Sequence, residues 1–122
     1  MKVLCGIGGS DDSLRALERT VARAVAAGDD LTIAIVDNPD SPRSPEELVE
    51  HAEEAATDAG IDAEIRRLEG DAGSQLVDVA EREGFEEIVL GGGKTSPMGK
   101  ITIGSIAEFV LLNANTSVTL VR

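Results

Sequence analysis

The sequence predicts an α/β fold: a doubly wound, mainly parallel five-stranded sheet with helices on both faces. Short apolar runs alternate with segments of helical periodicity in the order βαβαβαβαβ, and such alternation is typical of parallel sheets wound through right-handed crossovers. No repeat of roughly 20 to 50 residues indicates a solenoid. At 122 residues, the chain is expected to form one domain that spans residues 1–122.

The first half of the chain supplies two strands and two helices. Residues 3–7 form a short, continuous apolar run followed by glycines, which predicts a buried strand. Leucines, valines and alanines then recur at helical spacing as far as Gly28, and a second apolar strand covers residues 31–36. Three of the four prolines lie within residues 38–45, so we expect a loop there, followed by an acid-rich helix over residues 46–59.

The second half repeats the alternation. Residues 61–68 alternate apolar and polar side chains, which indicates an exposed or edge strand. The remaining expected elements are a helix over 75–83, a strand over 85–90, a glycine-rich loop over 91–105, a helix over 105–113 and a last strand over 117–121.

The composition argues against several partners. Twenty-three acids against eleven bases give a net charge of -12, and such a surface repels nucleic acids and anionic membranes. The acidic bias resembles that of halophilic proteins. No signal peptide precedes the first strand, and no apolar run approaches the roughly 20 residues of a membrane span, so we expect a cytoplasmic protein. Cys5, the single cysteine, lies in an apolar run and is interpreted as a buried, inert thiol.

The glycine-rich loop is the strongest candidate for a ligand site. It begins with Gly91, Gly92 and Gly93 and holds two of the three lysines, Lys94 and Lys100. Glycines let backbone N–H groups approach a ligand, and the following helix start attracts anions. These features predict a phosphate-binding loop, although a plain connection is the alternative.

A second glycine-rich loop, with Gly8 and Ser10, follows the first strand. In doubly wound sheets, ligands bind beyond the carboxyl ends of the strands, where the winding reverses direction. We therefore expect the loops after the first and fourth strands to flank this switch point. Asp11 and Asp12 could hold a ribose or a hydrated cation there, or could simply favour the helix start.

The start of the last helix carries a capping-box pattern. In Ser105-Ile106-Ala107-Glu108 the serine hydroxyl could accept from the N–H of Glu108, while that carboxylate reaches back to the N–H of Ser105. Entered through Gly104, the same helix start would leave other N–H groups free for a phosphate.

The remaining motifs either do not match a known binding pattern or are interpreted as structural. A Walker A motif would need glycine where Ile88 stands, and the dinucleotide fingerprint would need its third glycine where Asp11 stands. No catalytic constellation is visible. The single histidine, His51, is interpreted as a surface residue, and acids at element boundaries such as Glu87 as capping or solubilising residues.

With these motifs identified, the whole chain resembles the universal stress protein family. Residues 3–17 are similar to that family's opening strand, its Gly-Ser turn and a helix of Ser-x-x-Ala-Leu type, here residues 13–17. Residues 69–80 are like its third helix, and residues 88–91 like its fourth strand. The resemblance implies a sheet of strand order 3-2-1-4-5.

The resemblance also implies a nucleotide site. Nucleotide-binding members carry G-x2-G-x9-G-[ST], which suggests Gly91 as the first glycine and Gly104-Ser105 as the closing pair. Lys94 then stands at the second glycine, and Gly8 stands where members place an aspartate that contacts the nucleoside. Ile35 corresponds to a position that packs beside the adenine.

We therefore expect a cytoplasmic stress-response protein that binds ATP or AMP, with Mg²⁺ only alongside the nucleotide and without fast catalysis. One alternative is a nucleotide-free dimeric adaptor. Another is an ATP-cleaving enzyme, because residues 8–11 partly resemble the Ser-Gly-Gly-x-Asp-Ser loop of ATP pyrophosphatases. The candidate nucleotide-binding residues are Gly8, Ser10, Asp11, Ile35, Gly91, Gly92, Lys94, Lys100, Gly104, Ser105 and Ile106.

The last strand predicts a homodimer. A terminal strand in this winding lies at a sheet edge, and an exposed edge is a pairing hazard unless it is covered. The same strand of a second subunit would cover it around a two-fold axis, and members of the family commonly dimerise in this way. The expected interface residues are Val118, Thr119, Leu120 and Val121.

Overall fold

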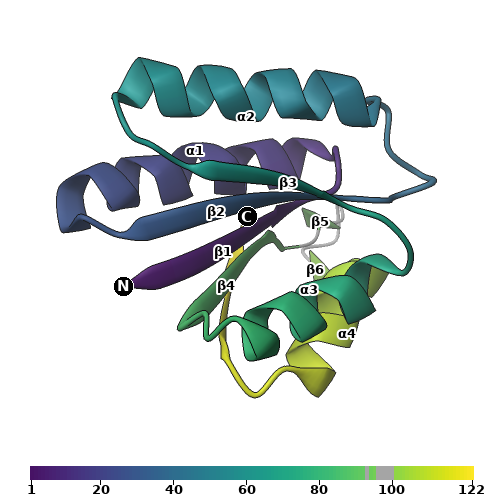
Figure 1. Cartoon of the computed structure of the whole chain (residues 1–122). Helices are drawn as coiled ribbons and strands as arrows, with labels where there is room; N and C mark the ends of the chain where they lie inside the picture. The colour runs from purple at the N-terminus through teal and green to yellow at the C-terminus, as the bar shows by residue number, and fades with distance from the viewer. Residues whose placement is uncertain (93, 96–100) are drawn as a thin grey trace.

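A computed structural model gives the architecture of the chain (Figure 1). It describes residues 1–92, 94–95 and 101–122, with the backbone alone for residues 94, 95, 101 and 102. Five strands form one parallel sheet in the order β3-β2-β1-β4-β7. The strands are β1 (Lys2–Ile7), β2 (Asp30–Val36), β3 (Glu64–Leu68), β4 (Glu87–Gly91) and β7 (Ser117–Val121). This confirms the predicted fold class, including the strand order.

Helices cover both faces of the sheet, as Figure 1 shows. One face carries α1 (Asp11–Ala27) and α2 (Pro45–Ala59), and the other carries α3 (Ala72–Arg82) and α4 (Ser105–Asn113). Side chains alternate along each strand, so the core is divided between the two faces of the sheet. Val3, Cys5 and Ile7 of β1 belong to the cluster under α1 and α2, whereas Leu4 belongs to the cluster under α3 and α4.

Glycines end the helices where the sequence predicts it. Gly28 and Gly60, the residues after α1 and α2, both adopt left-handed backbone conformations with φ of 70°. Their N–H groups donate back to the last turns, which satisfies carbonyls that would otherwise lack partners.

Three boundaries differ by two or more residues from those expected. The third helix begins at Ala72 instead of Gln75, because Asp71 caps it by accepting hydrogen bonds from Ser74. The third strand begins at Glu64 instead of Ile61, and the fourth at Glu87 instead of Phe85. The segment expected to be a loop throughout also contains a short antiparallel pair, β5 (Lys94–Thr95) with β6 (Ile101–Thr102).

The topology fixes where a site can form. β1 lies between β2 and β4, so the chain winds outward in one direction through β2 and β3 and in the other through β4 and β7. The loops after β1 and β4 therefore meet at the switch point, as the sequence predicts. In the described part of the chain, no helix is long and apolar enough to span a bilayer.

Candidate functional site

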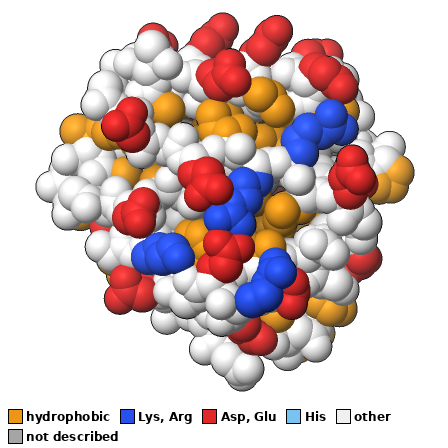
Figure 2. Space-filling model, viewed as in Figure 1, with side chains coloured by type: hydrophobic (Ala, Val, Ile, Leu, Met, Phe, Trp, Pro, Cys, Tyr) orange, Lys and Arg blue, Asp and Glu red, His pale blue; other side chains and the backbone are white. Residues whose placement is uncertain are grey.

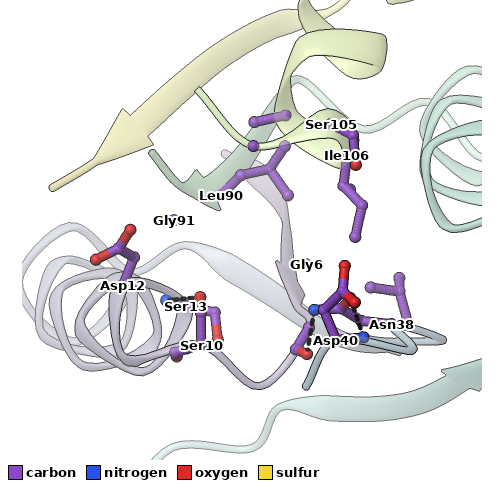
Figure 3. Close-up of a pocket in the computed structure, with 14 residues that line it drawn as sticks. Gly6, Ser10, Asp12, Ser13, Asn38, Asp40, Leu90, Gly91, Ser105 and Ile106 are labelled. Carbon is purple, nitrogen blue, oxygen red and sulfur yellow. Dashed lines mark hydrogen bonds between the residues drawn. The ribbon is translucent and has the colours of Figure 1, made fainter. Parts of the chain in front are cut away.

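A cavity of about 340 Å³ opens at the switch point, beyond the carboxyl ends of β1 and β4 (Figure 3). Four segments supply its walls: the end of β1 with the first turn of α1, the loop after β2, the end of β4, and the start of α4. The lining residues are Gly6, Gly8, Ser10, Asp12, Ser13, Val36, Asn38, Asp40, Leu90, Gly91, Gly104, Ser105, Ile106 and Ala107.

Close backbone approach shapes the inner wall. A Cβ atom on Gly91 would lie 2.6 Å from the carbonyl carbon of Asp12 and from the nitrogen of Ser13. Since both neighbours are backbone atoms, no side chain could move aside to make room. Gly91 thus lets the end of β4 rest directly on the first turn of α1.

The start of α1 is closed by its own side chains. The N-cap residue Ser10 accepts from the N–H of Ser13 at 3.2 Å, and the Ser13 hydroxyl donates to the Ser10 carbonyl at 2.7 Å. The N–H of Gly9 donates to the same Ser13 hydroxyl at 3.1 Å. Two acids, Asp11 and Asp12, occupy the first turn, where they complement the positive end of the helix dipole.

The start of α4 is different, and the predicted capping box is wrong. The N-cap is Gly104, with φ -65° and ψ 155° and no side-chain hydrogen bond. The N–H of Glu108 donates to the Gly104 carbonyl at 2.9 Å, so Ser105 is already the first helical residue and its hydroxyl cannot take the capping position. The first N–H groups of α4 therefore have no capping side chain among the described residues, and this helix start lines the cavity.

The loop after β2 closes the cavity on its other side. Asn38 donates from Nδ2 to the Gly8 carbonyl at 3.0 Å and accepts from the N–H of Asp40 at 3.2 Å. Arg43 donates to the Gly9 carbonyl at 2.7 Å. These bonds tie the loop to the end of β1, and Figure 3 shows Asn38 and Asp40 opposite Asp12, with Ile106 pointing in from α4.

The structure brings together six of the eleven candidate residues. Those that line the cavity are Gly8, Ser10, Gly91, Gly104, Ser105 and Ile106.

Three others, Asp11, Gly92 and Ile35, lie elsewhere. The Asp11 side chain is 78% exposed and pairs with Arg43 at 2.9 Å, outside the lining. Gly92 is buried, and its N–H donates to the carbonyl of Val121 at 2.7 Å. Lys100 and the side chain of Lys94 lie outside the described residues.

Ile35 faces the opposite side of the sheet from the cavity. It is 2% exposed and packs in the cluster under α1 and α2. Ile7 pairs with Ile35, so the next residues along each strand, Gly8 and Val36, share the other face, and both line the cavity. Period-two alternation from Gly8 could have identified Val36 from the sequence.

The sequence interpretation missed Asn38 and Asp40 as cavity residues. They lie in the proline-rich segment after β2, which carries no glycine pattern. The available signal was their position just beyond the carboxyl end of a strand beside β1.

The single cysteine does not line the cavity. Cys5 is fully buried in β1, and burial raises the pKa of its thiol to about 12, which confirms a buried, protonated side chain. Within the described residues, no group of three or more His, Cys, Asp or Glu side chains is placed to hold a metal ion. The cavity thus offers serine hydroxyls, two carboxylates, an amide and a helix start that no described side chain caps, around an apolar interior.

Comparison with known proteins shows which family the chain resembles. Residues 1–122 match the profile of the Universal stress protein family. Universal stress protein MJ0531 of Methanocaldococcus jannaschii is 29% identical over 77 residues, which are 63% of this chain and 45% of that relative. The matched segment therefore spans less than half of that curated relative's length.

Solved structures agree. A universal stress protein crystallised in complex with cAMP is 30% identical, with a TM-score of 0.78 over 100% of this chain and 96% of that one. A universal stress protein from Archaeoglobus fulgidus is 26% identical, with a TM-score of 0.71 over 100% of this chain and 98% of that one. With a family match over its full length and the same fold in these neighbours, the chain belongs to the universal stress protein family.

Proposed function

We propose that this protein binds an adenine nucleotide in the cavity at the switch point and acts as a cytoplasmic, nucleotide-responsive stress protein without fast catalysis. The observation that carries the proposal is the open start of α4, which lines the cavity. N–H groups that no described side chain caps, together with the helix dipole, favour a phosphate there. The relative at 30% identity that was crystallised with cAMP supports the same ligand class.

The lining suggests how the nucleotide lies. Val36, Leu90 and Ile106 form the apolar part of the wall, which suits the faces of an adenine ring. Asn38 and Asp40 can offer polar atoms to the nucleoside. The phosphate then points toward Gly104 and Ser105, with Mg²⁺ recruited only when a nucleotide supplies further phosphate oxygens.

Calorimetric titration of AMP, ATP and adenosine into the intact protein tests this function. The buffer should contain molar salt, because a chain of net charge -12 repels anions at low ionic strength. We expect saturable binding of AMP that is about tenfold tighter than that of adenosine, as a phosphate on a partly buried helix start would add roughly 1.4 kcal/mol. Phosphate release from ATP over hours should stay near the uncatalysed rate. Absence of binding by all three ligands would favour a nucleotide-free adaptor.

We also propose that the protein forms a homodimer through β7. This strand lies at one edge of the sheet and has no charged residue between Ser117 and Val121. The opposite edge strand, β3, carries Glu64, Arg66 and Arg67, and such charges discourage pairing between edges. The two edges thus differ in their protection, which supports pairing at β7.

Light scattering on a matched pair of variants tests the dimer. Val118→Lys with Leu120→Lys places charge on β7 and should halve the mass, whereas Ile65→Lys on β3 should leave it unchanged. Circular dichroism verifies that both variants fold. An intact protein that scatters as a monomer at micromolar concentrations refutes this assembly.

A further inference from the structure

A second hollow lies between α1 and α2, on the face of the sheet that α3 and α4 do not cover. It encloses about 500 Å³. Small side chains line it on both helices, namely Ala22 on α1 and Ala55 and Ala59 on α2, and their size leaves space between the helices. Leu14, Leu17 and Val21 of α1 complete an apolar floor.

The rim of this groove carries acids. Glu18 lies on the α1 side, and Glu54 and Asp58 lie on the α2 side, beside His51. No lysine or arginine is among the described residues that line it. The charges of the groove therefore have one sign around an apolar floor.

The whole of α2 continues this pattern. It contains six acids and no lysine or arginine, and the acids are Glu46, Glu47, Glu50, Glu53, Glu54 and Asp58. Among the described residues, Glu46 alone of these pairs with a cation, Arg67, at 3.4 Å. Figure 2 shows acidic side chains gathered along the top of the view, over α2, with apolar patches just below them.

Some acids elsewhere on the described surface pair with arginines. Arg23 bridges Asp29 and Glu87, and Arg66 bridges Glu64 and Glu83. The net charge of -12 favours solubility of the whole molecule. It does not explain why α2 has no basic residue while the neighbouring α1 and β3 contain arginines. An acidic rim around an apolar floor is the complement of a cationic, amphipathic ligand.

We propose that the α1–α2 groove, as defined by these lining residues, docks a basic amphipathic helix of a partner protein. Leucine-like side chains of the partner enter between Ala22 and Ala55, and its lysines or arginines reach Glu18, Glu54 and Asp58. Long basic side chains suit this geometry because their aliphatic stems cover apolar surface while their charges reach the rim.

The groove and the nucleotide cavity are separate sites on one helix. The first turn of α1 lines the cavity, whereas Leu14 and later residues of α1 line the groove, and no residue belongs to both. The α2 side of the groove lies away from the β7 edge, since α2 packs on β2 and β3. Docking can therefore be tested without nucleotide, and its failure would leave the proposed function untouched.

The test uses three fluorescein-labelled synthetic peptides of the same length with the intact protein. The first has leucines on one helical face and lysines on the other, the second replaces the lysines with glutamates, and the third replaces the leucines with glutamines. Fluorescence anisotropy in moderate salt should show saturable binding of the first peptide and at least tenfold weaker binding of the other two. Equal binding of the first and third peptides would mean attraction to charge alone and would overturn the proposal.

Matched variants locate the binding surface. Glu54→Lys and its neighbour Glu53→Lys change the net charge equally, but only Glu54 lines the groove. Ala22→Trp fills the groove, whereas Ala26→Trp adds the same side chain at an exposed position of α1 outside it. We expect Glu54→Lys and Ala22→Trp to weaken the first peptide about tenfold, and the two controls to change its affinity less than about twofold. Equal losses of affinity within each pair of variants would mean that the peptide binds elsewhere, and would refute docking in the groove.

Discussion

Two helix starts face each other across the cavity, and they are built in opposite ways. Ser10 caps α1, and Asp11 and Asp12 occupy its first turn. Gly104, which has no side chain, caps α4, and the first turn of α4 holds one acid, Glu108, where that of α1 holds two. An anion that enters the cavity therefore meets carboxylates at one helix and, among the described residues, N–H groups without a capping side chain at the other.

This difference in capping indicates which end of the cavity suits the phosphate of a nucleotide and which suits its nucleoside. A glycine-rich loop before a helix is present at both places in the sequence, so glycine content alone does not distinguish them. The capping residue does, because a side-chain oxygen at the N-cap occupies the N–H groups that a phosphate would use. We assign the phosphate to α4 and the uncharged nucleoside to the side of α1 and the loop after β2.

The largest expected effect comes from forcing the end of β4 away from the first turn of α1. In Gly91→Val the new side chain would collide with the backbone of Asp12 and Ser13, 2.6 Å from the Cβ position. We expect a loss of stability of about 1–3 kcal/mol from overpacking, together with loss of measurable AMP binding. Thermal unfolding and calorimetry measure the two effects.

Gly8→Ala serves as the control for that substitution. Its Cβ would have its nearest neighbour, Nδ2 of Asn38, at 3.4 Å, and should therefore fit with little loss of stability. If Gly91→Val bound AMP as well as the wild type, the close packing of β4 on α1 would be irrelevant to the site.

A smaller effect is expected from the lysines of the glycine-rich loop. The double change Lys94→Gln with Lys100→Gln removes two cations without adding charge and should weaken ATP about tenfold, because lysine contributes to phosphate binding through its charge. Adenosine, which carries no phosphate, should bind nearly as before. Parallel titrations of the two ligands make the comparison, and equal losses for both would argue against a phosphate role for these lysines.

The sequence predicts the fold well, because each helix and strand shows a single clear pattern of apolar residues. Continuous apolar runs identify the buried strands, the alternating pattern identifies β3 as an edge, and glycines mark the ends of α1 and α2. Boundaries are less certain where capping competes with periodicity, as with Asp71, which starts α3 three residues before the first residue expected.

The candidate site is only partly predictable, because side-chain direction and long-range pairing decide it. Ser105 has the right spacing from Glu108 for a capping box, but the helix starts one residue too early. Ile35 follows from family resemblance, yet the alternation of β2 turns it away and presents Val36. Glu87 illustrates the same limit, since an acid interpreted as a capping or solubilising residue is 8% exposed and bonded to Arg23 and Thr119.

The central claim is that the open start of α4 holds the phosphate, and Gly104→Asp tests it most directly. Among the described residues a side chain fits there, because the backbone is extended and none of their atoms lies within 4 Å of the Cβ position. The aspartate would make α4 resemble α1, stabilising the helix by roughly 0.5–1 kcal/mol through capping and the dipole. Gly104→Asn, which caps without charge, is the matched control.

The measurement is the ratio of AMP affinity to adenosine affinity, obtained by calorimetry in molar salt for the wild type and both variants. We predict a preference for AMP of about tenfold in the wild type that falls to near unity in Gly104→Asp, with an intermediate value in Gly104→Asn and similar adenosine affinity throughout. A preference for AMP that survives intact in a folded, stabilised Gly104→Asp protein would contradict the assignment of the phosphate to α4.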